Sequence, residues 1–322
     1  MDTAEPTLAA SPLVEAQRKI ALLEANVGRV IRGKPEVIRL AVVSLLARGH
    51  VLIEDVPGVG KTTLAQALAR SVGLAFQRIQ FTSDLLPSDI IGVSIFNQKN
   101  QEFEFIPGPL FANVVLADEI NRATPKTQSA LLEAMSERKV SVERKRYALP
   151  QPFVVLATQN PMEYQGTFPL PESQLDRFLM SLAIGYPPRR EERELLFSGG
   201  VEGLLDDMRP VVGREELVEL QERVSEVRVA EKLADYMLTL AEATRSGGDY
   251  LLGVSTRAVQ SIYRAVQALA LAEGREYAVP DDVQRLAPAV LAHRVVLRRA
   301  GGGLEANRDA IRRTVESIPV PL

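Results

Sequence analysis

The chain has 322 residues, of which 46% are hydrophobic and 25% are charged, and its mean hydropathy is zero. These values are ordinary for a folded soluble protein, and the length predicts about two domains. A net charge of −3 and a pI near 5.7 disfavour a protein that neutralises many nucleic-acid phosphates, and the lack of cysteine excludes disulfides and thiolate-bound zinc.

The N-terminal residues do not predict a secretory signal. Its first dozen residues contain acidic side chains and two prolines, but no basic stretch followed by an apolar core. The longest apolar runs, such as 111–117 and 153–157, are far shorter than the roughly 20 residues that cross a bilayer. We therefore expect a frayed N-terminus and a cytoplasmic protein without a membrane span.

Up to about residue 185, short β-branched runs alternate with longer helical stretches, which is typical of a parallel sheet covered by helices. The expected strands, which should form one buried core, are 51–54, 78–81, 114–118, 153–157 and 180–184. Helical spacing of Leu, Ala and Met predicts helices over 62–71 and 127–138. Their expected sheet-facing residues are Leu64, Leu68, Leu131, Leu132 and Met135.

Two inserts interrupt this alternation, and each predicts a β-hairpin. The first alternates apolar with polar residues around a polar loop, with Val93, Ile95, Phe103 and Phe105 as its apolar members. The second does the same around 143–146, with Val140, Val142, Tyr147 and Leu149. A plain parallel sheet needs neither insert.

The strand pattern stops at 185–190, a segment rich in Gly and Pro. We place a hinge there, with one domain over 1–187 and a second, helical domain over 188–322. The helices expected in the second domain are 190–198, 214–226, 230–246, 256–273 and 280–294. An apolar stripe in the fourth is formed by Ala258, Ile262, Ala265, Val266 and Leu269. Asp281 or Asp282, behind Pro280, marks the start of the fifth.

Residues 54–62 read Glu-Asp-Val-Pro-Gly-Val-Gly-Lys-Thr and lie between the first expected strand and the first expected helix. They match the phosphate-binding Walker A pattern except at its first glycine, which is Asp55 here. Gly58 and Gly60 let backbone N–H groups approach phosphate oxygens, and the helix that follows directs its positive N-terminus at the anion. Lys61 would then neutralise the β- and γ-phosphates of ATP, and Thr62 would ligate Mg²⁺. The alternative, a Gly-rich turn with a surface lysine, is disfavoured by the flanking strand and helix.

The expected strand 114–118 ends in two adjacent carboxylates, Asp118 and Glu119. This arrangement fits Walker B chemistry, in which one carboxylate reaches the magnesium and its neighbour polarises the attacking water. We assign Asp118 to the metal and Glu119 to the water. The alternative is a strand that ends in a helix N-cap, where acidic residues are also favoured.

Three further polar segments are candidates for the same site. The strand 154–157 leads into Thr158, Gln159, Asn160 and Pro161, where Asn160 is placed to hold the water or the γ-phosphate. The other segments are 175–178, which contains Arg177, and 253–257, which ends in Arg257. Taken alone, the first would be an Asn-Pro turn and each arginine a solvated surface residue.

Taken in order, five of these segments resemble a MoxR-family AAA+ ATPase over nearly the whole chain. They are 55–62, 116–123, 127–135, 157–161 and 174–178. The resemblance implies a five-stranded parallel sheet of order 5-1-4-3-2, an α-helical lid, ATP and Mg²⁺ bound between them, and a ring, usually a hexamer. It matches Asn160 to sensor 1, Arg177 to the arginine finger of a neighbour's site, and Arg257 to sensor 2 in the lid.

The same resemblance extends the nucleotide site and identifies the inserts. Residues 30–33 resemble the segment that lines the adenine pocket, and the hairpins match the helix 2 and pre-sensor 1 inserts. Thr256 replaces the proline of the family's sensor 2 pattern, which is a departure from the family. The nucleotide contacts expected in total are Ile31, Pro57, Gly58, Val59, Gly60, Lys61, Thr62, Thr63 and Arg257.

We weigh three functions from different classes. The favoured one is a chaperone-like remodelling ATPase; the resemblance suggests clients with a von Willebrand factor A domain and a role in metalloenzyme maturation or stress responses. A nucleic-acid motor or DNA-loading factor is the alternative, based on a basic hairpin tip of Arg144, Lys145 and Arg146 joined by Arg138 and Lys139. An ATP-binding switch without turnover is disfavoured by Glu119, Asn160 and Arg177, and a kinase or GTPase is less favoured still.

Overall fold

The computed structural model describes residues 11–143, 145–160, 166–197, 201–298 and 302–321. Some predicted features lie outside these ranges: the frayed N-terminus up to residue 10, Arg144 of the basic tip, Pro161, and the last residue of the helix 190–198. Within the described ranges, no helix is both long and apolar enough to cross a bilayer.

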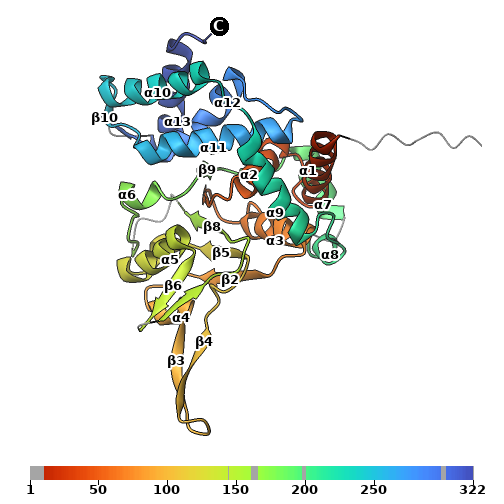
Figure 1. Cartoon of the computed structure of the whole chain (residues 1–322), viewed down its shortest axis with the longest axis vertical. Helices are drawn as coiled ribbons and strands as arrows, with labels where there is room; N and C mark the ends of the chain where they lie inside the picture. The colour runs from red at the N-terminus through yellow and green to blue at the C-terminus, as the bar shows by residue number, and fades with distance from the viewer. Residues whose placement is uncertain (1–10, 144, 161–165, 198–200, 299–301, 322) are drawn as a thin grey trace, which may run out of the picture.

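The core is a five-stranded parallel sheet flanked by helices (Figure 1). Its strands are β1 (Val51–Glu54), β2 (Phe76–Gln80), β5 (Val114–Asp118), β8 (Val154–Gln159) and β9 (Met180–Leu182). They lie in the order β2-β5-β8-β1-β9, which is the predicted 5-1-4-3-2 counted from the other edge. The fold class and all five strands are confirmed, with ends that shift by up to two residues.

Successive residues of the central strands pack into two different cores. In β5, Val114 and Leu116 join the core that includes helices on one side of the sheet, α1 (Pro12–Gly28), α2 (Pro35–Leu46) and α3 (Lys61–Val72). Val115 and Ala117 join the core under α5 (Pro125–Glu137) on the other side. This alternation is expected for strands covered on both faces. The prediction of five buried strands is wrong for β2, an edge strand in which only Ile79 is buried.

Both predicted hairpins are present. The first consists of β3 (Gly92–Asn97) and β4 (Glu102–Pro107), follows α4 (Pro87–Ile91), and projects away from the body of the molecule (Figure 1). The second consists of β6 (Lys139–Val142) and β7 (Lys145–Ala148). The rings of Phe105 and Tyr147 stack with centroids 4.0 Å apart, so the base of the first hairpin rests on the second.

After β9 the chain is mainly helical, as predicted. Its helices are α7 (Arg189–Phe197), α8 (Glu202–Asp206), α9 (Arg214–Arg223), α10 (Glu231–Ser246), α11 (Thr256–Ala272), α12 (Pro280–Leu291) and α13 (Gly303–Ser317). The predicted ends of α9 and α12 form separate 3₁₀ turns, η2 (Val224–Glu226) and η3 (Ala292–Arg294). Two short elements complete the core, η1 (Ile120–Arg122) and α6 (Glu172–Leu175).

The prediction that strands stop after residue 185 is wrong. Strands β10 (Tyr250–Leu252) and β11 (Val296–Leu297) pair antiparallel among the C-terminal helices. With three and two residues, they are too short to show the alternation that predicts a strand.

The segment that follows the predicted hinge packs along the core helices. Gln221 of α9 donates to the carbonyl of Leu45 in α2 at 2.7 Å, and Asn26 of α1 donates to the carbonyl of Arg209 at 3.1 Å. Helix α11 contacts both α1 and α2. The boundary between residues 187 and 188 stays a prediction.

A buried arginine joins the C-terminal helices to the sheet. Arg294 of η3 forms an ion pair with Asp176 at 3.0 Å and donates to the carbonyls of Phe178 at 2.6 Å and Val290 at 2.7 Å. Its side chain is 2% exposed, and this burial lowers its pKa to about 10 against the opposing effect of Asp176. Arg294 therefore fixes the turn that carries Arg177 just before β9.

We expect Arg294→Ala to lower the free energy of unfolding by about 3–5 kcal/mol, because the change leaves the Asp176 carboxylate without its buried partner. Urea unfolding measures this loss. The control is Arg312→Ala on the exposed side of α13, which should change stability by no more than about 0.5 kcal/mol. If Arg294→Ala lowered the free energy of unfolding as little as Arg312→Ala does, the buried ion pair would not be what joins the C-terminal helices to the sheet.

Candidate active site

The phosphate loop connects β1 to α3. Gly58 and Gly60 have φ angles of 81° and 92°, in the left-handed region that side chains disfavour. Gly60 is the N-cap of α3, and no side chain caps the helix, so its first N–H groups are available to an anion. In the described structure, the Lys61 ammonium donates to the carbonyl of Asp55 at 2.6 Å.

A cavity of about 490 Å³ lies in front of this loop. Its lining includes eleven of the predicted site residues: Ile31, Pro57, Gly58, Val59, Gly60, Lys61, Thr62, Thr63, Asp118, Glu119 and Asn160. The structure thus brings together the ends of three strands, β1, β5 and β8, at the carboxyl edge of the sheet, where open α/β sheets bind ligands.

Asp118 is held by two partners that the sequence analysis did not identify. The hydroxyl of Thr158, on β8, donates to one oxygen at 2.6 Å. The guanidinium of Arg78, on β2, donates to the other at 2.6 and 3.1 Å. Both partners come from the strands that neighbour β5, since β5 lies between β2 and β8 as the expected strand order has it.

Glu119 lies just past β5 in a left-handed conformation with φ of 56°. Its carboxylate accepts hydrogen bonds from the amide of Gln80 at 2.8 Å and from Arg122 at 3.3 Å. The adjacent carboxylates therefore have different partners, as their different predicted roles require. Gln80 faces Asp118 across the β2–β5 ladder, so only its side chain reaches Glu119.

The residues assigned to magnesium fit that ion. Thr62 and Asp118 line the same cavity and offer a hydroxyl and a carboxylate oxygen, the hard donors that Mg²⁺ prefers. Among the described residues, no group of three or more His, Cys, Asp or Glu could hold a metal by itself. This agrees with a magnesium that takes its remaining ligands from phosphate and water.

The rest of the cavity is lined by two chain segments that meet beside the phosphate loop. One is 30–34, which precedes α2; the other contains Ile184, Gly185 and Pro187, which follow β9. Leu195 and Val201 add apolar surface from beyond the predicted hinge. Such a wall suits the planar apolar faces of a nucleotide base.

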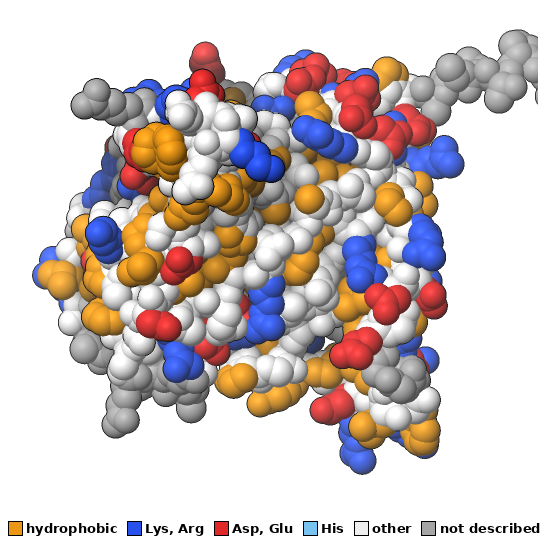
Figure 2. Space-filling view, turned by 90° about the horizontal axis from the view of Figure 1, so that it is seen from below, with side chains coloured by type: hydrophobic (Ala, Val, Ile, Leu, Met, Phe, Trp, Pro, Cys, Tyr) orange, Lys and Arg blue, Asp and Glu red, His pale blue; other side chains and the backbone are white. Residues whose placement is uncertain are grey.

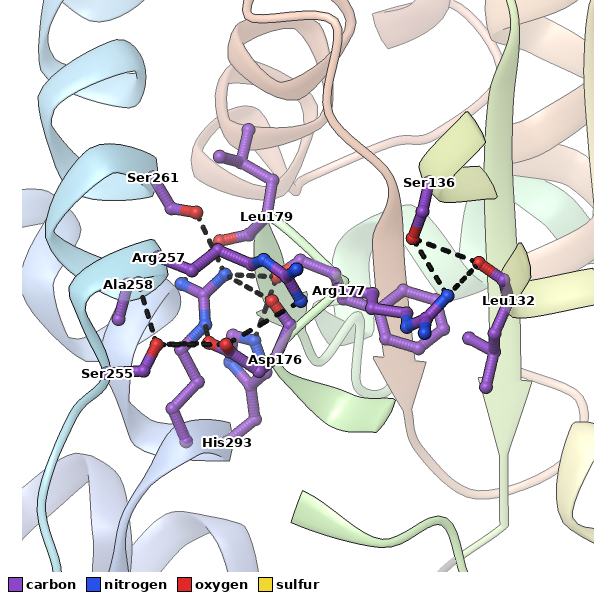
Figure 3. A network of polar contacts seen from close by, with 12 residues as sticks. Leu132, Ser136, Asp176, Arg177, Leu179, Ser255, Arg257, Ala258, Ser261 and His293 are labelled. Carbon is purple, nitrogen blue, oxygen red and sulfur yellow. Dashed lines mark hydrogen bonds and ion pairs between the residues drawn. The ribbon is translucent and has the colours of Figure 1, made fainter. Parts of the chain in front are cut away.

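Arg177 and Arg257 do not line this cavity. Arg177 donates to the carbonyl of Leu132 at 2.6 Å and to the hydroxyl of Ser136 at 2.9 Å. Arg257, at the start of α11, lies 3.9 Å from Asp176, whose carboxylate also accepts from Ser255 (Figure 3). Arg257, one of the expected nucleotide contacts, therefore does not line the cavity of its own copy in the described structure.

A second cavity, of about 470 Å³, collects these arginines and others. Its lining includes Arg48, Arg138, Arg177, Arg257 and Arg264, with Glu137 and Asp176 as its acidic residues. Burial lowers the pKa of Arg138, and the like charges of Arg48 and Arg264 lower it further. An anion that entered this cavity would relieve that repulsion.

Arg138 corrects one part of the sequence analysis, which grouped it with the basic hairpin tip. It ends α5 and faces the second cavity instead. Arg264 was missed, although its spacing of seven from Arg257 places the two on one face of a helix.

The two cavities lie at opposite ends of β1 and β9. Gly49, His50 and Leu179 of the second cavity precede these strands, whereas the phosphate loop and Ile184 of the first follow them. A strand as long as β1 spans about 13 Å, which is more than an arginine side chain can bridge. One copy therefore holds the two halves of the predicted site apart.

Both histidines are buried, and His50 contributes to the lining of the second cavity. His50 accepts from the N–H of Val155 at 3.0 Å and contacts the carbonyl of Met135 at 3.1 Å, and burial lowers its pKa to about 4. Burial also lowers the pKa of His293 well below the usual value. Both are neutral residues whose hydrogen bonds are to the main chain.

Comparison with known proteins gives matches over most of the chain. Residues 50–180 match the family described as "ATPase family associated with various cellular activities (AAA)", and residues 242–314 match the AAA lid domain. A crystal structure of a suggested ATPase from Cytophaga hutchinsonii superposes with a TM-score of 0.87 at 36% identity, covering 96% of this chain and 97% of that one.

Three relatives are similar over nearly their full length. YeaC of Bacillus subtilis is 48% identical, with 92% of this chain and 93% of YeaC covered. Chaperone MoxR1 of Mycobacterium tuberculosis is 42% identical, with 92% and 81% covered. MoxR of Methylorubrum extorquens is 33% identical, with 94% and 95% covered. The chain therefore belongs to the MoxR family of AAA+ ATPases.

Proposed function

We propose that this chain hydrolyses ATP in sites completed by a second copy of itself, and that it uses the turnover to remodel client proteins as a chaperone. The observation that carries the proposal is the separation of the two cavities, because each holds only part of an ATPase site. The phosphate-loop residues and the two carboxylates line one, and Arg177 and Arg257 line the other.

The first cavity supplies binding and activation of water. Backbone N–H groups at the start of α3 and the Lys61 ammonium bind the phosphates, while Thr62 and Asp118 hold the metal. Mg²⁺ bound there neutralises charge on the β- and γ-phosphates. Glu119 accepts a proton from the attacking water, and Asn160, which is 7% exposed, orients that water or the γ-phosphate.

The second cavity supplies positive charge to the site of a neighbouring copy. Arg177 would stabilise charge that develops on the neighbour's γ-phosphate, and Arg257 would contact the same nucleotide. A contact between different faces of identical chains is head-to-tail, and it closes into a ring when the rotation permits. Six copies, by family resemblance, are our proposal for that ring.

Three of the proposed site side chains have a protein partner in the described structure. Asp118 is paired with Arg78, Glu119 is bonded to Gln80, and Arg177 donates to Leu132. Binding and assembly would exchange these contacts for phosphate, metal and water. We therefore interpret the described conformation as a resting one.

The first hairpin is the feature that supports a protein client. Its exposed apolar side chains are Val93, Ile95, Phe96, Phe103 and Ile106. They belong to an arm that projects from the body (Figure 1), where apolar segments of another protein could bind. The relative named chaperone MoxR1 supports the same role. We further propose clients with a von Willebrand factor A domain and work in metalloenzyme maturation or stress responses, on the family resemblance alone.

We expect Arg177→Ala to bind ATP with unchanged affinity but to lower kcat by about 10³-fold or more, because a finger acting from a neighbour stabilises only the transition state. Equilibrium binding and steady-state ATPase assays separate the two effects. The matched control is Arg18→Ala on the exposed side of α1, which should keep both values. Wild-type turnover by Arg177→Ala would rule out the finger.

The client class is tested by adding polymers to the ATPase assay. We expect a permanently unfolded polypeptide to raise turnover severalfold, and Phe96→Ser with Phe103→Ser to abolish the increase without changing basal turnover. Single- and double-stranded DNA should have no effect, since the face around the hairpin carries mixed acidic and basic side chains (Figure 2). Strong stimulation by DNA would favour the nucleic-acid motor instead.

A further inference from the structure

Asp55 stands where the common Walker A pattern has a glycine, and its carboxylate is fully used. One oxygen accepts from the N–H groups of Ile184 at 2.6 Å and Gly185 at 2.7 Å. The other accepts from the N–H of Val56 at 2.8 Å. The residue is 9% exposed, so these bonds lie out of water.

These bonds extend the sheet where the main chain cannot. Strands β1 and β9 pair as far as Ile53 and Leu182, and beyond that point β1 turns into the phosphate loop. Beyond this point the Asp55 carboxylate, instead of a main-chain carbonyl of β1, accepts the N–H groups of Ile184 and Gly185. A glycine offers no acceptor for them.

The segment that Asp55 holds is a wall of the nucleotide cavity. Ile184, Gly185 and Pro187 all line the cavity, and the chain continues directly into α7. The next residue, Pro188, lies so close to Gly33 that a Cβ on that glycine would be 2.6 Å from the proline ring. Asp55 thereby holds the main chain at 184–185, and Pro188 of the same segment packs against Gly33 in the adjoining segment 30–34.

The main chain of the same residue contacts the phosphate-binding lysine, since Lys61 donates to the Asp55 carbonyl. One residue thus contacts the group that senses phosphate and the segment that leads toward the C-terminal helices. We propose that Asp55 is a positioning residue, which sets the cavity wall for the nucleotide and couples the phosphate loop to the segment 184–188. This inference rests on the proposed ATPase function.

Two substitutions at residue 55 separate this positioning role from the common Walker A pattern. Asp55→Gly would restore the common Walker A pattern, yet it should impair the site, because two buried N–H groups lose their acceptor. Asp55→Asn should do much less harm. Its amide oxygen can accept both N–H groups, and only the contact with Val56 is lost.

Hydrogen exchange measured by mass spectrometry on nucleotide-free protein tests whether Asp55 holds the main chain at Ile184 and Gly185. In Asp55→Gly, a peptide that covers Ile184 and Gly185 should exchange about tenfold faster, while a peptide from α10 stays unchanged and reports that the chain is folded. Asp55→Asn should exchange close to the wild type. The matched control is Asp89→Gly, which removes a carboxylate that accepts the N–H of Leu86 in another part of the chain.

Steady-state kinetics tests the functional half. We expect the KM for ATP of Asp55→Gly to rise about fivefold to tenfold with a smaller change in kcat, since the residue shapes binding rather than the reacting atoms. Asp55→Asn should recover most of that loss. Unchanged exchange at 184–185 in Asp55→Gly, or a KM equal to that of Asp89→Gly, would overturn the proposal. A wild-type protein without ATPase activity would refute the proposed function instead and would leave the exchange result to stand alone.

Discussion

The length of a parallel strand is the constraint on which the site depends. The residues proposed to bind phosphate and metal gather after β1, β5 and β8, at the edge where the carboxyl ends meet. The arginines gather before β1 and β9, at the other edge. Since a side chain cannot span a strand, we propose that a second copy of the chain brings the two groups of residues together. Assembly would then control turnover.

The C-terminal helices hold the segments that carry Arg177 and Arg257. Arg294 fixes the turn before β9 from inside the protein, and Asp176 in that turn also contacts Ser255 and Arg257 at the start of α11 (Figure 3). Arg285 of α12 also pairs with Glu36 of α2, which follows the cavity-lining segment 30–34. These polar joints connect both cavities to one set of helices, so movement of the helices would change both halves of the site.

Much of this could be predicted from the sequence, for definite reasons. Strands buried on both faces are continuous apolar runs, so β1 and β5 were predicted with their observed ends, and the residues that follow them form the cavity. The expected strand order places β2 and β8 beside β5, but it does not say which of their side chains reach Asp118. Arg78 reaches Asp118 because of the register between β2 and β5, and Arg138 faces a cavity rather than the hairpin tip because of how α5 ends. The strands β10 and β11 are too short to leave a pattern, and the place of Arg257 depends on the packing of α11 against α1 and α2.

The central claim is that one copy cannot complete the ATPase site. The most direct measurement is ATP turnover per subunit over a wide range of protein concentration, with sedimentation at the same concentrations to report the assembly state. The account predicts that turnover per subunit is nearly lost where the chain is monomeric and rises steeply as the assembly forms. Constant turnover per subunit down to concentrations at which only monomers sediment would contradict it.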